Sequence, residues 1–197
     1  MSHHQPTLVA GVDEVGRGAL FGPVVAAAVI LLPTQAAQLA AAGVTDSKKL
    51  TAKRRTALAV KIRATAEAAQ VAYATVWEID RLNILQASLL AMQRAVKRLT
   101  PQPMKCLVDG NQRIPNLGID QETWVKGDAR SVEIASASIL AKVWRDELIV
   151  RLDTRYPGYD LASNKGYGSA KHRQALLRQG ATRQHRQSFA PCRVQQE

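Results

Sequence analysis

The chain has 197 residues, of which 46% are hydrophobic, and this is enough for one buried core without support from disulfides. Lys and Arg number 27 against 16 Asp and Glu, and the resulting formal net charge of +11 favours a polyanionic partner such as nucleic acid, although it could also serve solubility alone. Two cysteines argue against a disulfide-stapled secreted protein, and the longest apolar stretch, residues 24–32, is far short of the roughly 20 residues of a membrane-spanning helix.

Hydrophobic periodicity and turn residues predict alternating strands and helices. In chain order, the expected strands are residues 8–15, 24–32, 71–76, 104–108 and 123–125, and the expected helices are residues 47–69, 79–99, 131–153 and 170–178. Gly16, Gly18 and Gly22 predict a turn between the first two strands. This order indicates an α/β fold with a mixed sheet, in one domain of residues 1–197 that has an α/β core at 1–155 and a turn-rich, helical C-terminal segment at 156–197.

Acidic residues follow three apolar runs, at the ends of expected strands. They are Asp13 and Glu14, Asp109, and Asp128. Carboxylates next to an apolar strand are costly to bury unless a cation or hydrogen-bond donors compensate them, and oxygen ligands suit Mg²⁺ or Mn²⁺. Each acid taken alone could instead cap a turn or pair with an arginine. Together, in a basic protein, they favour a metal site.

A two-metal site of such carboxylates can cleave a phosphodiester by in-line displacement, with two divalent ions stabilising the attacking and the leaving oxygen. Gly16, Arg17 and Gly18 come directly after the first acidic pair, and the two glycines would let backbone amides approach a sugar-phosphate closely. Without the acids nearby, the same glycines would indicate no more than a hairpin turn.

Six sequence segments together resemble the ribonuclease HII family, the type 2 ribonucleases H. In order, they are GVDEVGRG at 11–18, DSKKL at 46–50, VDG at 108–110, VKGD at 125–128, ASILAKVWRD at 137–146 and KGY at 165–167. The resemblance covers nearly the whole chain. It implies a ribonuclease H-like mixed sheet flanked by helices, with a helical C-terminal segment.

The resemblance also implies roles for individual residues. Asp13, Glu14, Asp109 and Asp128 would be the catalytic acids that hold Mg²⁺ or Mn²⁺, with two ions when substrate is bound. Gly16, Arg17 and Gly18 would recognise the ribonucleotide 2′-hydroxyl through their backbone, Lys48 would contact phosphate, and Tyr167 would pack on the sugar beyond the cleaved junction. The implied reaction is endonucleolytic cleavage on the 5′ side of a ribonucleotide, which leaves a 3′-hydroxyl and a 5′-phosphate.

Two positions depart from the family pattern, because Asn164 stands where a His is expected and Ala129 where Ser is frequent. Neither departure removes an expected metal ligand, but Asn164 leaves open that Tyr167 only braces the C-terminal segment. Lys48 could equally be a solvated residue at a helix start, and Arg145 is ambiguous in the same way between phosphate contact and solvation.

Several other residues carry weaker signals. His172 and His185 each lie alone in a basic segment, which favours exposed side chains without a catalytic role over proton shuttles. Trp144 is expected to pack in the core rather than stack on a base. Glu78 and Asp80 are expected to cap the helix that starts near residue 79.

The expected partners are RNA/DNA hybrids and duplex DNA that contains ribonucleotides, and no membrane. The alternatives are a non-catalytic hybrid binder, and a type 3 ribonuclease H, against which the short segment before the first strand argues. The short tail after residues 189–191 predicts no sliding-clamp peptide at the C-terminus. Free thiols at Cys106 and Cys192 and the absence of a secretory signal in residues 1–6 predict a cytoplasmic protein, and a monomer is expected.

Overall fold

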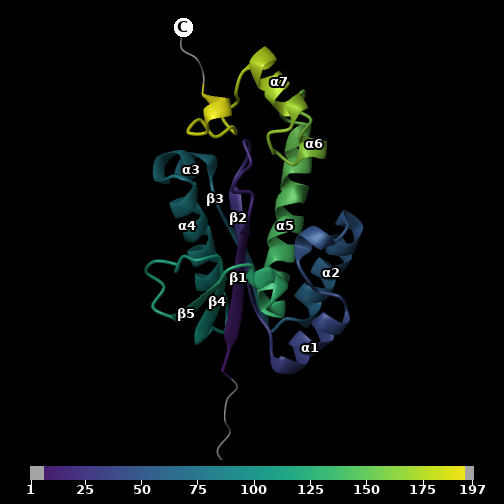
Figure 1. Ribbon diagram of the computed structural model, residues 1–197, viewed down its shortest axis with the longest axis vertical. Helices are drawn as coiled ribbons and strands as arrows, with labels where there is room; N and C mark the ends of the chain where they lie inside the picture. The colour runs from purple at the N-terminus through teal and green to yellow at the C-terminus, as the bar shows by residue number, and fades with distance from the viewer. Residues whose placement is uncertain (1–6, 194–197) are drawn as a thin grey trace, which may run out of the picture.

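A computed structural model describes residues 7–193, which form a five-stranded sheet with helices on both faces (Figure 1). The strand order is β3-β2-β1-β4-β5, and the strands span Val9–Val15 (β1), Val24–Ile30 (β2), Ala68–Ala74 (β3), Lys105–Asp109 (β4) and Asp120–Trp124 (β5). Strand β2 pairs antiparallel with both β1 and β3, whereas β1, β4 and β5 are parallel. The mixed sheet expected from the sequence is confirmed.

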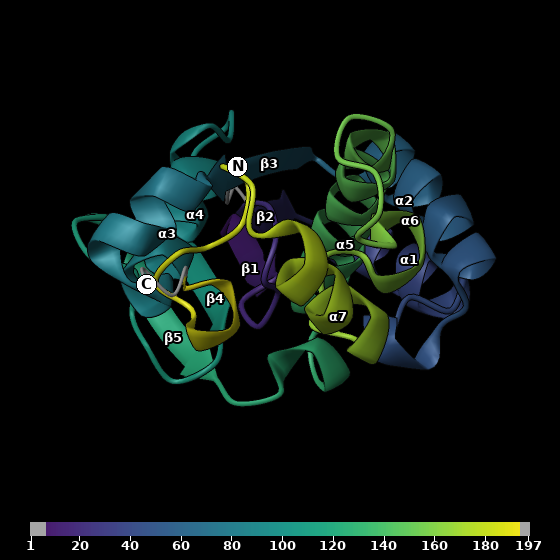
Figure 2. The same ribbon diagram turned by 90° about the horizontal axis from the view of Figure 1, so that it is seen from above.

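The helices form one layer on each face of the sheet (Figures 1 and 2). On one face lie α1 (Pro33–Ala41), α2 (Ala52–Thr65) and the long α5 (Val132–Asp153), and on the other lie α3 (Val76–Leu82) and α4 (Ile84–Lys97). Strand β2 is buried at every position, and its side chains alternate between the two hydrophobic clusters. A strand covered on both faces is apolar throughout, which explains the unbroken run at 24–30.

Helix α5 lies very close to β1 because Gly11 has no side chain. A Cβ atom at Gly11 would come within 2.1 Å of the backbone carbon of Glu133, in the first turn of α5. Ser131 caps this helix, its hydroxyl accepting a hydrogen bond from the backbone N–H of Ile134. The position and direction of α5 are therefore fixed where it starts, beside the expected acidic site.

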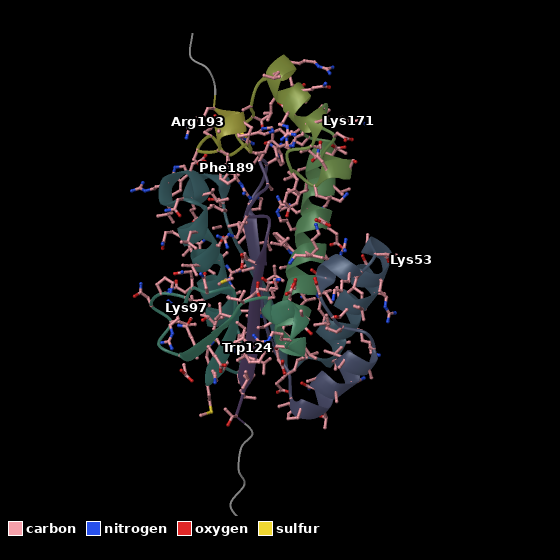
Figure 3. All side chains as sticks on the ribbon, viewed as in Figure 1. Lys53, Lys97, Trp124, Lys171, Phe189 and Arg193 are labelled. Carbon is pink, nitrogen blue, oxygen red and sulfur yellow. The ribbon has the colours of Figure 1, made fainter. Side chains whose placement is uncertain are left out.

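The C-terminal segment crosses the top of the sheet in Figure 1 and packs on the turn between β1 and β2. It contains α6 (Leu161–Asn164), α7 (Ala170–Gln179) and a short 3₁₀ helix at Ala190–Cys192. Figure 3 labels Lys171 and Phe189 on the two sides of this segment. A small apolar cluster joins it to the turn through Leu20 and Phe21. The expected helical C-terminal segment is thus present. The tail in which no sliding-clamp peptide is expected includes residues 194–197, which lie outside the described residues.

The helix expected at 79–99 is two helices, divided at Asn83. Asn83 has φ of 71°, and its side-chain oxygen accepts hydrogen bonds from the backbone N–H groups of Leu85 and Gln86, so it ends α3 and caps α4. The helix expected at 47–69 begins at Ala52 after a 3₁₀ turn and ends at Thr65. Helix α1 was not expected, and β5 starts three residues earlier than predicted.

The expected capping of a helix by Glu78 and Asp80 is correct only for Glu78. Thr75 and Glu78 form a capping box at the start of α3. Asp80 instead accepts hydrogen bonds from the backbone N–H groups of Gln187 and Ser188, and so anchors the C-terminal segment to α3. Sequence spacing could not show this contact, because the partners lie 107 and 108 residues away.

The expectation of free thiols is also met. Cys106 and Cys192 are both free and buried. Among residues 7–193, no helix combines the length and the apolar character that a membrane span needs.

Candidate active site

The four expected acids lie at one end of three neighbouring strands. Asp13 and Glu14 are the fifth and sixth residues of β1, and Asp109 is the last residue of β4. Because β1 and β4 are parallel and Val12 pairs with Val108, Asp13 and Asp109 follow the paired residues on adjacent strands. Asp128 lies in the 3₁₀ turn Gly127–Ala129, which follows β5 and precedes α5.

The backbone of this turn holds Asp109 and Asp128 near each other. The N–H of Gly127 donates a 2.7 Å hydrogen bond to Oδ1 of Asp109. Lys126 adopts a left-handed conformation with φ of 56°, and a Cβ atom at Gly127 would come within 2.5 Å of the Ile134 side chain. A side chain at Gly127 would therefore displace that of Ile134, and the N–H of Ala129 donates a hydrogen bond to the carbonyl of Lys126 within the turn.

Electrostatic repulsion among these carboxylates is only partly compensated. Burial raises the pKa of Asp13 well above its usual range, and the neighbouring Glu14 and Asp109 raise it further. Burial also raises the pKa of Glu14 and of Asp109, although Arg17 lowers that of Glu14 and the Gly127 hydrogen bond lowers that of Asp109. A cluster whose members resist ionisation together is one that a cation would stabilise.

Two basic side chains reach the cluster from solvent. Nζ of Lys48 lies 3.4 Å from Oδ2 of Asp128, and Nη1 of Arg17 lies 3.4 Å from Oε1 of Glu14. Their side chains are 83% and 50% exposed, so water and salt weaken both pairs. The basic motif residue Lys48 is therefore placed at the edge of the acidic cluster, and Arg17 is as well.

Within the described part of the chain, no three His, Cys, Asp or Glu side chains are near enough to form a complete set of metal ligands as they stand. The available donors in the cluster are carboxylate oxygens from β1, β4 and the Asp128 turn. Oxygen donors with incomplete charge compensation fit a hard divalent cation such as Mg²⁺ or Mn²⁺, which keeps several waters and needs few protein ligands. The residue types therefore fit the expected ions.

A buried arginine binds the backbone carbonyl groups of the Gly-Arg-Gly turn. Arg186 is fully buried, and its guanidinium donates hydrogen bonds of 2.7 Å to the carbonyl oxygens of both Gly16 and Arg17 and one of 3.0 Å to that of Gly22. Burial and the neighbouring Arg145 lower the pKa of Arg186 to about 9. Arg186 thus fixes the turn through the backbone alone.

Arg145, on α5, also binds backbone carbonyl groups of the β1–β2 turn. The sequence left open whether Arg145 contacts phosphate or is solvated, and the structure shows that it is neither. It is fully buried, and it donates hydrogen bonds to the carbonyl oxygens of Phe21, Pro23 and Lys165. These bonds join the β1–β2 turn to the turn that carries Tyr167. The sequence could not show these contacts, because the carbonyl oxygens of Pro23 and Phe21 lie 122 and 124 residues from Arg145.

Tyr167 lies beside the Gly-Arg-Gly turn, half-buried, and forms an isolated antiparallel bridge with Ala19. Its ring centroid is 5.7 Å from Nζ of Lys142 and 5.4 Å from Cζ of Arg145. Asn164, which replaces the expected His, donates to the carbonyl of Tyr159 and accepts from the N–H of Gly166, so it stabilises this turn. The structure therefore brings Tyr167 to Ala19, the residue that follows Gly18.

Other sequence expectations have mixed outcomes. Trp144 is half-buried and stacks on Tyr73 with ring centroids 5.8 Å apart, as expected of a packing residue. The expectation that His172 and His185 are exposed is wrong, because both are fully buried and lie 3.0 Å apart, Nε2 to Nε2. Each completes the hydrogen bonding of the other, which a sequence separation of 13 residues could not reveal.

Comparison with known proteins decides between the nuclease families. The sequence model of the family described as Ribonuclease HII matches residues 10–192. The chain belongs to the ribonuclease HII family. Ribonuclease HII from Acaryochloris marina (strain MBIC 11017) is 70% identical over 186 residues, which are 94% of this chain and 94% of the relative. Enzymes of the ribonuclease HII family cleave the RNA of RNA/DNA hybrids, and this chain is a nuclease of that class.

Solved structures agree with this family assignment. The ribonuclease H2 from Pyrococcus horikoshii OT3 superposes with a TM-score of 0.79 at 28% identity, covering 94% of this chain and 95% of the other. Bst-RNase HIII, solved in complex with Mn²⁺, has a TM-score of 0.70 at 22% identity and covers 98% of this chain and 73% of its own. The likeness to the type 3 enzyme shows a shared fold, whereas the family match identifies the chain as ribonuclease HII.

Proposed function

We propose that this ribonuclease HII cuts on the 5′ side of ribonucleotides embedded in duplex DNA, as well as within RNA/DNA hybrids, and leaves a 3′-hydroxyl and a 5′-phosphate. The observation that carries the proposal is that the Gly-Arg-Gly turn directly follows the carboxylates of β1, with Arg17 paired to Glu14, and that Tyr167 forms a bridge with Ala19, the residue after this turn. A site that recognises one ribose needs such a recognition surface within one nucleotide of the reacting phosphate.

In this proposal Asp13, Glu14, Asp109 and Asp128 hold two divalent ions, Mg²⁺ or Mn²⁺. When bound, these ions supply charge that stabilises the attacking and leaving oxygens of an in-line displacement. The chain's own part is to hold the carboxylates on adjacent strands, where the Gly127 N–H orients Asp109. The Mn²⁺ complex of Bst-RNase HIII, which shares the fold, supports a divalent ion here.

Recognition of the ribonucleotide is proposed to use the backbone of Gly16, Arg17 and Gly18. Arg186 already binds the carbonyl oxygens of Gly16 and Arg17, so the turn is rigid before substrate arrives. Backbone groups held in this way can bond the 2′-hydroxyl, the one group that distinguishes RNA from DNA at a single position. Tyr167 would pack on the following deoxyribose and fix the junction, while Lys48 would contact phosphate.

A cleavage assay tests the proposal. In Mg²⁺, the protein should cut a labelled duplex with one ribonucleotide at the phosphodiester on its 5′ side, and the products should carry a 3′-hydroxyl and a 5′-phosphate. Chelation of the metal should stop the reaction. An uncut but bound duplex would instead indicate a non-catalytic binder, and cleavage of continuous hybrids with poor cleavage of the single ribonucleotide would contradict the proposed specificity.

Tyr167→Ala tests the recognition part of the proposal. Because an aromatic contact with a nucleotide contributes about 1 to 3 kcal/mol, the variant should cleave the single-ribonucleotide duplex roughly tenfold more slowly or worse. Cleavage of a continuous RNA strand paired with DNA should fall less, and Tyr167→Phe should be milder on both substrates. Equal losses on both substrates, together with a lower melting temperature, would mean that Tyr167 is structural.

A further inference from the structure

Two buried histidines lie outside the carboxylate cluster, between the C-terminal segment and the β1–β2 turn. His172 belongs to α7, and His185 follows that helix and forms an isolated antiparallel bridge with Phe21. Both side chains are fully buried. Burial lowers the pKa of His172, and burial together with His172 lowers that of His185 to about 4. Both rings are therefore neutral at physiological pH.

The hydrogen bonds around the rings allow one arrangement of protons. The backbone N–H of Thr182 donates to Nδ1 of His185 at 2.9 Å, so the proton of His185 is on Nε2. Nε2 of His185 then donates to Nε2 of His172 at 3.0 Å, so the proton of His172 is on Nδ1. Nδ1 of His172 donates to the carbonyl oxygen of Tyr167 at 2.9 Å.

The chain of hydrogen bonds thus starts at Thr182 and ends at Tyr167. The same carbonyl of Tyr167 also accepts from the N–H of Ser169, so its two acceptor sites fix the peptide plane that follows Tyr167. On the other side of the residue, the N–H of Tyr167 donates to the carbonyl of Asn164, so the backbone from which the Tyr167 side chain leaves is held at both ends. At the other end of this series of hydrogen bonds, the ring of His185 packs edge-on against that of Phe21, with ring centroids 5.0 Å apart, beside the recognition turn.

We infer that His172 is a positioning residue for Tyr167, that His185 selects the tautomer of His172 that this role requires, and that the pair thereby contributes to selectivity for an isolated ribonucleotide. The inference rests on the proposed role of Tyr167 in recognition. It assigns the histidines no proton transfer to substrate, because every ring nitrogen is occupied by the groups named above. A histidine pair that served packing alone would have no need of one particular tautomer at each ring.

The tautomers can be measured directly in the intact protein. In ¹⁵N-labelled protein at neutral pH, long-range ¹H–¹⁵N spectra should show a protonated Nδ1 and a bare Nε2 for His172, and the reverse for His185. This measurement does not depend on activity or on metal. A His172 that is protonated on Nε2, or on both nitrogens, would overturn the inference whatever the substrate specificity of the enzyme.

Cleavage rates then test the functional consequence. The readout is the rate on a single-ribonucleotide duplex divided by the rate on a continuous hybrid. His172→Leu should lower this ratio by roughly threefold to tenfold, which is the range expected for one buried hydrogen bond. His172→Asn keeps an N–H donor near the Nδ1 position and should recover part of the ratio. Adding His172→Leu to Tyr167→Ala should lower the ratio no further, since both changes act through one ring.

Tyr159→Phe is the matched control, because Tyr159 packs on both histidine rings and its hydroxyl donates to the carbonyl of Gly180. It removes a buried hydrogen bond from the same cluster and leaves the chain to Tyr167 intact, so the ratio should stay unchanged at a comparable loss of melting temperature. An equal fall of the ratio in Tyr159→Phe would show a merely structural effect. If Tyr167→Ala lowers the ratio and His172→Leu does not, the positioning role of His172 is wrong and the proposed role of Tyr167 stands. If Tyr167→Ala leaves the ratio unchanged, the proposed role of Tyr167 is wrong, and the inference about the histidines is wrong with it.

Discussion

Asp13 combines a buried position, with 5% of its surface exposed, and two carboxylate neighbours that raise its pKa. Asp13→Asn should therefore abolish cleavage, since it removes one charged ligand of the proposed metal site without emptying a core position. Without divalent metal, the same change should raise the melting temperature by roughly 2 to 4 °C, the shift that about 1 kcal/mol gives in a chain of this size. Activity and thermal melting, measured on the same protein, check both effects.

Asp120→Asn provides the control for that experiment. Asp120 is exposed at the start of β5, away from the cluster, so its neutralisation should change neither activity nor melting. Cleavage by Asp13→Asn within a few-fold of the wild-type rate at saturating Mg²⁺ would contradict the metal assignment.

At the scale of single residues, the sequence reveals those candidate site residues that lie in short motifs. Asp13, Asp109 and Tyr167 follow short, recognisable patterns, and the structure brings them to one end of the sheet. Arg145 lies in the segment at 137–146 and Arg186 lies in none of the six segments, and for neither residue does the sequence show its partners. Both bind carbonyl oxygens that lie far away in sequence, so the buried environment that gives them a role exists only in the folded chain.

The β1–β2 turn offers a comparison between two glycines. A Cβ atom at Gly16 would lie 2.2 Å from Nε of Arg145, and φ is 91° there, whereas Gly18 has no other atom within 4 Å of that position. Gly16→Ala should lower the melting temperature by roughly 5 °C or more, because strain and steric overlap add. Gly18→Ala should melt within about 2 °C of the wild type, as exposed substitutions do.

Cleavage by the same two variants separates stability from recognition. If the backbone of Gly18 approaches the sugar as proposed, Gly18→Ala should lose cleavage of the single-ribonucleotide duplex while its fold is intact. Wild-type melting of Gly16→Ala would contradict the contact with Arg145, and full activity of Gly18→Ala would remove Gly18 from the recognition surface.

Helices α3 and α4 are joined by an ion pair with a predictable dependence on pH. The carboxylate of Glu78 lies 2.6 Å from Nη2 of Arg94, and this hydrogen bond is the main reason that the pKa of Glu78 is lowered to about 2. A carboxyl group with a lowered pKa stabilises the folded state above its unfolded pKa, and that contribution is lost as the pH falls toward 2. Glu78→Gln should therefore cost roughly 1 kcal/mol at pH 7 and clearly less at pH 3.

Urea unfolding at the two pH values measures this difference, with Glu67→Gln as the control. Glu67 is exposed and has no salt bridge among residues 7–193, so the cost of its replacement should be small at both pH values. An equal cost of Glu78→Gln at pH 7 and pH 3 would show that the Glu78 charge does not stabilise the α3–α4 unit.

At the scale of elements, periodicity predicts the existence of most strands and helices but not where they divide. Residues 79–99 keep one apolar face, so the pattern indicates one helix, yet Asn83 breaks it with a backbone conformation that its own side chain compensates. The sequence pattern of helix α1 is weak, because the helix is short and Leu39 is its one large buried side chain. Its position depends on contacts with α2 and α5.

The whole molecule carries a formal net charge of +11, which predicts binding to hybrid duplexes that weakens steeply with salt. Lys48→Ala should flatten the slope of log affinity against log salt by about one phosphate contact. Lys97→Ala is the control, since Lys97 is exposed on α4, on the opposite side of the sheet from α5 (Figure 3). Equal slopes for Lys48→Ala and the wild type would leave Lys48 as a solvated residue beside Asp128.

We propose that residues 1–197 act as one domain, with a core at 1–155 and a C-terminal segment at 156–197. The support is the set of hydrogen bonds by which Arg186 and Asp80 join the two parts. If the C-terminal segment were independent of the core, Arg186 would not bind the turn that is proposed to recognise substrate. The sequence shows the composition of this segment, but its place over the β1–β2 turn is a property of the folded molecule.

The bonds from Arg186 to Gly16, Arg17 and Gly22 span 164 to 170 residues. During synthesis the ribosome makes the glycine turn more than 160 residues before Arg186. All five strands precede residue 125, so the sheet can assemble on the emerging chain while the turn still lacks its guanidinium partner. A nascent chain would thus complete the proposed recognition turn only after Arg186 has been added.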